Sequence, residues 1–186
     1  MILLHMKKGV LFFVLVGGWL WLPLPAQSAY ERRNISWQED RRLTWADFLA
    51  DPDTGSVFHA LSSTGIAFSS TAKIHGKQVF VDFDVHCFFD PNESWVAVGK
   101  HSPALLTHEQ IHFDIAEVFA RKLLRQLRQI EYGPHDYQQK MDAEFASVLD
   151  EMEEIHSRYG RETAHGLNKE VQQKWALMVQ KKLSAR

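Results

Sequence analysis

The clearest alternation of apolar and polar residues in the sequence runs through residues 77–89. A period of two is typical of a β-strand with one buried face, so this stretch is predicted to be a strand, closed by the turn at residues 90–92. Small and β-branched residues at 60–70 predict another strand, and residues 94–99 predict a further short one. The apolar face of the main strand consists of Val79, Val81, Phe83, Val85, Cys87 and Phe89.

Beyond Ser102 the apolar residues recur at helical spacing. Ser102 followed by Pro103 is a typical helix start, with a capping hydroxyl and then a proline in the first turn. Gly133 and Pro134 are predicted to end this helix, and Gly160 is predicted to separate two more. Strands first and helices second indicate an α+β fold, with N-terminal antiparallel strands followed by three helices. The last helix is predicted to carry Leu167, Val171, Trp175, Met178 and Leu183.

Residues 1–29 have the layout of a secretory signal peptide. Lys7 and Lys8 give a basic start, residues 9–24 are almost entirely apolar, and residues 26–29 offer small side chains for cleavage. The alternative is an uncleaved membrane anchor, but the apolar run is short and its exit is rich in proline and small residues. We therefore expect export to the periplasm or the outside of a bacterial cell. Residues 30–186 are then one domain with no stable membrane insertion.

Charge and cysteine content narrow the class of protein. Without Lys7 and Lys8, 19 basic residues stand against 23 acidic ones. A nucleic-acid-binding protein would need a basic face, so we expect no nucleic-acid partner.

Cys87 is the only cysteine, which excludes an internal disulfide. The stability of an exported domain of this kind must then come from packing or a bound metal.

The stretch "LLTHEQIHFDIAE" carries two histidines four positions apart, with a glutamate directly after the first. Residues four apart on a helix differ by about 40° around the axis, so His108 and His112 can share one ion. Glu109 lies to the side, where it can hold a water without displacing a ligand. This is the HExxH arrangement of zinc peptidases, in which two imidazoles bind Zn²⁺ and the glutamate acts as general base.

Chance alone can produce so short a motif, but its surroundings favour a functional pair. The pair lies on an apolar stripe and is predicted to face the interior, where a bare histidine pair is costly. A catalytic zinc usually has three protein ligands. Asp114 and Glu117 lie on the same helix but point away from the histidine pair, so neither is expected to be the third ligand. Glu117 is instead free to pair with Arg121. The third ligand must come from another segment. The possible residues are His156, Glu144 and Glu162, and the best candidate is His165.

Five segments resemble, in the same order, a bacterial family of unknown function whose members are described as predicted secreted zinc-dependent proteases. They are "RLTWADF", "SWV", "LLTHEQIHFDIAEVFARKL", "ETAHG" and "QQKW". The resemblance covers nearly all of residues 30–186. It implies His108 and His112 as zinc ligands, Glu109 as catalytic base, and a second signature at residues 163–166 that contains His165. This chain departs from the family at Gly160, where an aspartate is usual.

We therefore expect a zincin-like domain that is a zinc-dependent peptidase. Zn²⁺ binds His108, His112 and His165, and Glu109 deprotonates the water that attacks a peptide or protein substrate. An exposed edge strand within residues 60–89 can hold an extended peptide, and Tyr159 is a candidate for stabilising the oxyanion. The alternatives are a non-catalytic periplasmic binding module that zinc stabilises, and a zinc amidase that acts on cell-wall amides. A glutamate beside the histidine pair favours chemistry, because structure alone would not require an acid there.

Overall fold

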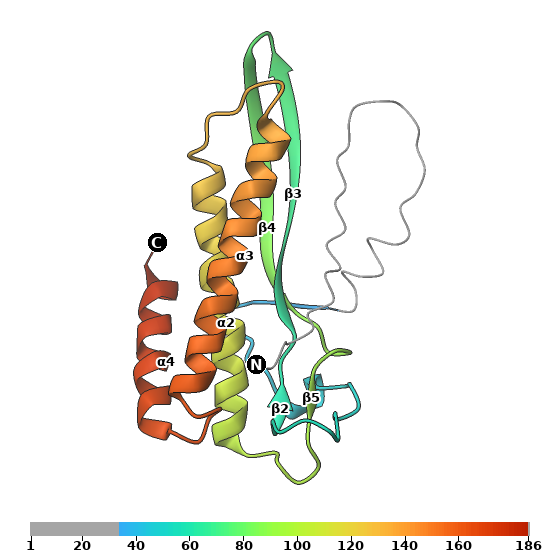
Figure 1. Cartoon of the computed structure of the whole chain (residues 1–186), viewed down its shortest axis with the longest axis vertical. Coiled ribbons are helices and arrows are strands. Elements are labelled where there is room, and N and C mark those ends of the chain that lie inside the picture. The colour runs from blue at the N-terminus through green and yellow to red at the C-terminus, as the bar shows by residue number, and fades with distance from the viewer. Residues whose placement is uncertain (1–33, 186) are drawn as a thin grey trace.

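The computed structural model describes residues 34–185, so the predicted signal peptide at residues 1–29 lies outside the described residues. The prediction of an α+β fold with antiparallel strands followed by three helices is confirmed (Figure 1). Within residues 34–185, no helix is long and apolar enough to cross a membrane. The elements are β1 (Ile35–Ser36), the 3-10 turn η1 (Trp45–Asp47), β2 (Ala60–Leu61), β3 (Thr64–His75), β4 (Gln78–Phe89), β5 (Trp95–Val96), α2 (Pro103–Leu127), α3 (Tyr137–Glu162) and α4 (Lys169–Ser184).

Strands β3 and β4 form a long antiparallel hairpin that runs beside α2 and α3 (Figure 1). The strand order is β1-β4-β3, so β3 is an edge strand among the described strands, as the sequence predicted. The apolar face of β4 is buried towards its end, where Cys87 and Phe89 are 1% and 0% exposed. Alternation identified this strand because only one of its faces packs against the helices.

The predicted strand at residues 60–70 is divided into β2 and β3. Strand β2 pairs with β5, whereas β3 pairs with β4. Side-chain contacts separate the two strands, because the Ser63 N–H donates to Ser94 Oγ at 2.9 Å and the Ser62 hydroxyl donates to Glu109 at 2.6 Å. The break therefore places Ser62 against the helix that carries the histidine pair.

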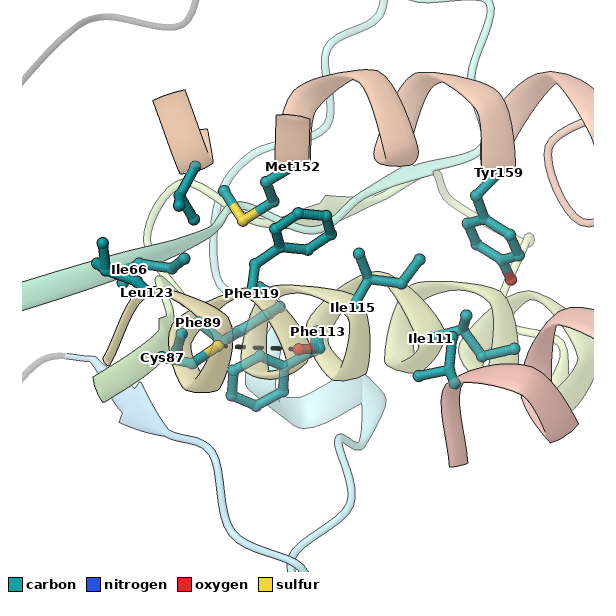
Figure 2. Close-up of a cluster of buried hydrophobic side chains, with 14 of the residues drawn as sticks. Ile66, Cys87, Phe89, Ile111, Phe113, Ile115, Phe119, Leu123, Met152 and Tyr159 are labelled. Atoms are coloured by element: carbon teal, nitrogen blue, oxygen red, sulfur yellow. Dashed lines mark hydrogen bonds between the residues drawn. The ribbon is translucent and has the colours of Figure 1, made fainter. Parts of the chain in front are cut away.

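Helix α2 is the centre of the fold and packs against β4, β3, α3 and α4. It begins as predicted, with the Leu105 N–H donating to Ser102 Oγ at 3.2 Å. It ends at Leu127, ahead of Gly133 and Pro134. Figure 2 shows its side chains packed between the sheet and α3, with the Cys87 thiol 3.8 Å from the Phe113 carbonyl oxygen. This packing fixes α2 on both sides.

The boundary between the last two helices differs from the prediction, and two of the apolar residues expected on the last helix are exposed. Gly160 does not interrupt a helix, because α3 continues to Glu162. The Asn168 side chain caps α4 by accepting a hydrogen bond from the Val171 N–H at 3.2 Å. Leu167 therefore precedes α4 and is 76% exposed. Met178 is also exposed, and the helix buries Gln172, Trp175 and Val179.

Candidate functional site

His108 and His112 lie on one face of α2, as their spacing predicts. Their ring centroids are 4.9 Å apart and the rings are perpendicular. His108 is 3% exposed, whereas His112 is only partly buried. The pair lies where the N-terminal part of α2 meets the C-terminal end of α3, and His112 keeps some access to solvent.

Tyr159 of α3 supports both rings from the core. Its ring stacks on His108 at 4.6 Å and meets the edge of His112 at 4.8 Å. Figure 2 shows the side chain reaching from α3 towards α2, and its hydroxyl donates to the His108 carbonyl oxygen at 3.4 Å. Tyr159 is fully buried, and burial raises the pKa of its phenol. These contacts favour a packing role for Tyr159 over the predicted role in stabilising an oxyanion.

His156 of α3 contacts the pair directly. Its Nδ1 atom lies 2.8 Å from Nδ1 of His112, and the two rings stack with centroids 5.0 Å apart. The sequence offered His156 only as one of several possible third ligands. Its contact with His112 depends on how α2 and α3 pack, which the spacing of residues within one helix does not reveal.

His165 lies in an unusual loop between α3 and α4. Ala164, His165 and Gly166 all have positive φ angles, of 47°, 52° and 86°. A non-glycine residue in this left-handed region costs roughly 1–2 kcal/mol, so such a loop persists only where its surroundings hold it. Here two backbone hydrogen bonds hold the loop, both 2.8 Å long. The His165 N–H donates to the Gly160 carbonyl oxygen, and the Asn168 N–H donates to the Thr163 carbonyl oxygen. Strain of this kind gathers at functional sites.

Two glycines let this loop approach the histidine pair. A Cβ atom at Gly160 would lie 3.3 Å from the His165 ring, and one at Gly166 would lie 3.2 Å from the His108 Cβ atom. Burial lowers the pKa of both His108 and His112, and the charge of nearby His165 is a lesser cause. The His165 side chain itself is exposed, so it forms the solvent side of the cluster. Gly160 thus makes room for the His165 ring.

Burial keeps the inner histidines neutral. It lowers the pKa of His108 to about 4, with a further decrease caused by His165 and an opposing effect of Gln172. It also lowers the pKa of His156 to about 4 and that of His112 well below its usual value. A neutral imidazole is the form that binds a metal. His108 Nδ1 and His156 Nε2 are buried without a hydrogen-bond partner among the described residues.

Glu109 lies beside the pair and is 3% exposed. The Ser62 hydroxyl donates to its Oε2 atom at 2.6 Å. Burial raises the pKa of Glu109 to about 7, although the hydrogen bonds from Ser62 oppose the rise. A general base works best when its pKa is near the operating pH, so this carboxyl is suited to proton transfer. Sequence reasoning missed Ser62, and no motif in the strand region marks it.

Two acids that the sequence offered as third ligands have other partners. The Glu162 carboxylate accepts a hydrogen bond from the Trp175 indole N–H at 2.8 Å. Glu144 lies near Tyr132, whose pKa is raised to about 12 by burial and by that carboxylate. Neither contact involves the histidine cluster.

The other two acids on α2 are also engaged elsewhere. Glu117 pairs with Arg121 at 2.7 Å, so that prediction is confirmed. Asp114 accepts hydrogen bonds from the Trp37 indole at 2.9 Å and the Gln110 amide at 2.8 Å. Both acids therefore serve the packing of α2, as their direction on the helix indicated.

The cluster fits zinc by the chemistry of its donors, since several neutral imidazoles lie together. Among residues 34–185, however, no group of three or more His, Cys, Asp or Glu side chains is placed as metal ligands are. Binding of an ion would thus require side chains to move towards one another.

Comparison with known proteins identifies one domain. A family model described as "Bacterial protein of unknown function (DUF922)" matches residues 91–166. The matched segment contains β5, α2, α3 and the loop with His165, and so includes the whole histidine cluster and Glu109. No curated protein and no solved structure shows significant similarity to the chain. The family description names no activity.

Proposed function

We propose that this chain is a zinc-dependent peptidase with a zincin-like active-site helix, in which His108, His112 and His165 bind Zn²⁺ and Glu109 is the general base. One observation carries the proposal. A buried glutamate with a pKa raised to about 7 lies next to two neutral histidines on the same face of α2. Packing alone would favour an apolar residue at such a position, because a buried carboxyl is costly.

Each residue has a role in hydrolysis. When bound, zinc would polarise the substrate carbonyl and make water more acidic. Glu109 takes the proton from the attacking water and then passes it to the leaving amine. The Ser62 hydroxyl holds the carboxylate of Glu109 in place through its 2.6 Å hydrogen bond. His165, exposed and held by its strained loop, completes the ligand set from the solvent side.

A substrate can approach from the side of His165. The His165 ring lies 4.7 Å from Phe58, which also lines an open hollow of about 440 Å³. Val57 and Val98 line the same hollow and are 79% and 90% exposed. These apolar surfaces suit an apolar side chain of a peptide. Ser62 leads directly into the edge strand β3, to which an extended peptide can add.

The amino-acid sequence supports action outside the cytoplasmic membrane of a bacterium. Residues 1–29 have the pattern of a signal peptide, and the remainder carries more acidic than basic residues. A peptide or protein is therefore a more suitable substrate than a nucleic acid.

A second function has a specific observation in its favour. Glu109 is almost completely buried and already bonded to Ser62. These features suit a non-catalytic module in which zinc orders the helices. The two functions differ in what happens when Glu109 loses its charge.

The test combines metal analysis with a peptide library. Protein purified without chelator should contain about one zinc per chain and cleave peptides. Glu109→Gln should retain zinc but cleave about 100-fold more slowly or worse, because it cannot act as base. Glu117→Gln, a matched change on the same helix, should cleave like wild type. Absence of zinc even after its addition, or full activity of Glu109→Gln, contradicts the proposal. Zinc binding without any cleavage supports the non-catalytic module.

A further inference from the structure

His156 and His112 must share one hydrogen atom. Their Nδ1 atoms are 2.8 Å apart, which is the distance of a hydrogen bond. A neutral imidazole has one N–H donor and one acceptor nitrogen. One of the two rings therefore donates from Nδ1 and the other accepts.

The direction of this hydrogen bond decides whether His112 can bind a metal through its other nitrogen. If His112 donates, its Nε2 atom keeps a lone pair and can be a ligand. If His112 accepts, its Nε2 atom carries the hydrogen and cannot bind an ion. The rings of His108 and Tyr159 also contact His112, in each case edge to face. His156 is thus the neighbour that can set the tautomer.

We infer that His156 is a positioning residue whose Nδ1 atom accepts the hydrogen bond from His112 and so holds His112 in the tautomer that binds metal. This inference rests on the proposed metal centre. Histidine ligands almost always donate their second nitrogen to a carboxylate, a carbonyl oxygen or water, which fixes the ring and its tautomer. Here a neutral imidazole takes that place and adds no charge to the site.

The surroundings of His156 fit such a role. Stacking with centroids 5.0 Å apart and an angle of 27° keeps its ring against His112. α3 carries both His156 and Tyr159, so one helix supports both histidines of the pair.

Asparagine and glutamine distinguish a positioning role from a general effect on packing. The side-chain amide of asparagine lies at the position of a histidine Nδ1 atom, whereas that of glutamine extends to the position of Nε2. His156→Asn can therefore accept the hydrogen bond from His112, and His156→Gln serves as its matched control. His156→Leu keeps an apolar side chain of similar size but accepts nothing.

Zinc affinity of the metal-free full chain should be measured by competition with a coloured chelator, beside a urea unfolding curve of each metal-free variant. His156→Leu should bind zinc about 10- to 100-fold more weakly than wild type. His156→Asn should return to within a few-fold of wild type, and His156→Gln should remain weak. The urea midpoint of each variant shows whether it is folded. If His156→Leu does not fold, the comparison of His156→Asn with His156→Gln tests the inference.

The outcomes separate this inference from the proposed function. If wild type binds no zinc, the proposed metal centre fails and the inference fails with it. If wild type binds zinc but His156→Asn is as weak as His156→Leu, only the positioning role is refuted. A complete loss of zinc in His156→Asn, equal to that in His112→Ala, would make His156 a ligand and also refute it. Wild-type affinity in His156→Leu would show that His156 does not act on His112.

Discussion

Replacement of Glu109 by glutamine should change how the stability of the metal-free protein depends on pH. The carboxyl is 3% exposed, and burial raises its pKa from 4.5 to about 7. Glutamine has nearly the same shape, and its amide oxygen can still accept the hydrogen bond from Ser62. The substitution therefore removes a titration while it leaves the packing almost unchanged.

The sign of the effect follows from the raised pKa. Below pH 4.5 the Glu109 carboxyl is protonated in both the folded and the unfolded protein. Between pH 4.5 and about 7 the folded protein holds a proton on this carboxyl that the unfolded chain has lost. The stabilising contribution is thus fully present below pH 4.5 and is lost as the pH rises through about 7. At about 1.4 kcal/mol for each pH unit, wild type should lose up to about 3 kcal/mol relative to Glu109→Gln across this range.

Urea unfolding with chelator present, at about pH 5 and about pH 8, measures this difference. The histidines of the cluster are present in both proteins, so their titration cancels when the two free energies of unfolding are subtracted. The advantage of Glu109→Gln should grow from the lower to the higher pH. An equal difference at both pH values would show that Glu109 titrates like an exposed carboxyl, and the argument for a general base would lose its support.

Three further outcomes are expected. Gly160→Ala should weaken zinc binding, because the new methyl group would lie 3.3 Å from the His165 ring. This is expected even though alanine in a helix is usually favoured over glycine by about 1 kcal/mol. An unchanged zinc affinity in a chelator competition would show that the His165 ring is not held there. The Cys87 thiol, whose pKa is raised by burial, should react with a thiol reagent only in urea, and rapid labelling of the folded protein would contradict its burial. Asp114→Asn should lower the free energy of unfolding by about 1–3 kcal/mol, since Trp37 and Arg42 lose a charged partner, without a change in zinc affinity; a variant as stable as wild type in urea would refute this.

Periodicity in the sequence predicted the elements that bury one face. Residues 77–89 alternate because one side of β4 packs against helices, and Ser102 marks the start of α2 because it caps that helix. The prediction that Gly160 interrupts a helix was wrong. A glycine costs a helix only about 1 kcal/mol, and the contacts of Tyr159 beside it outweigh that cost.

The candidate site was predictable only where its residues lie on one helix. Spacing placed His108 and His112 together, since helical geometry is the same in every protein. The contact of His156 with His112 depends on how two helices pack, and the Ser62 contact joins residues 47 positions apart. The start of α4 is marked by the cap at Asn168, which the positions of its apolar residues did not reveal.

The most direct test of the account is a crystal structure of the protein with zinc, with the ion located by its anomalous scattering. One ion is expected, with Nε2 of His108, Nε2 of His112 and an imidazole nitrogen of His165 each about 2.0–2.1 Å away. Glu109 should lie beside the ion without binding it. An ion bound elsewhere, or no ion near His112 at saturating zinc, would contradict the account.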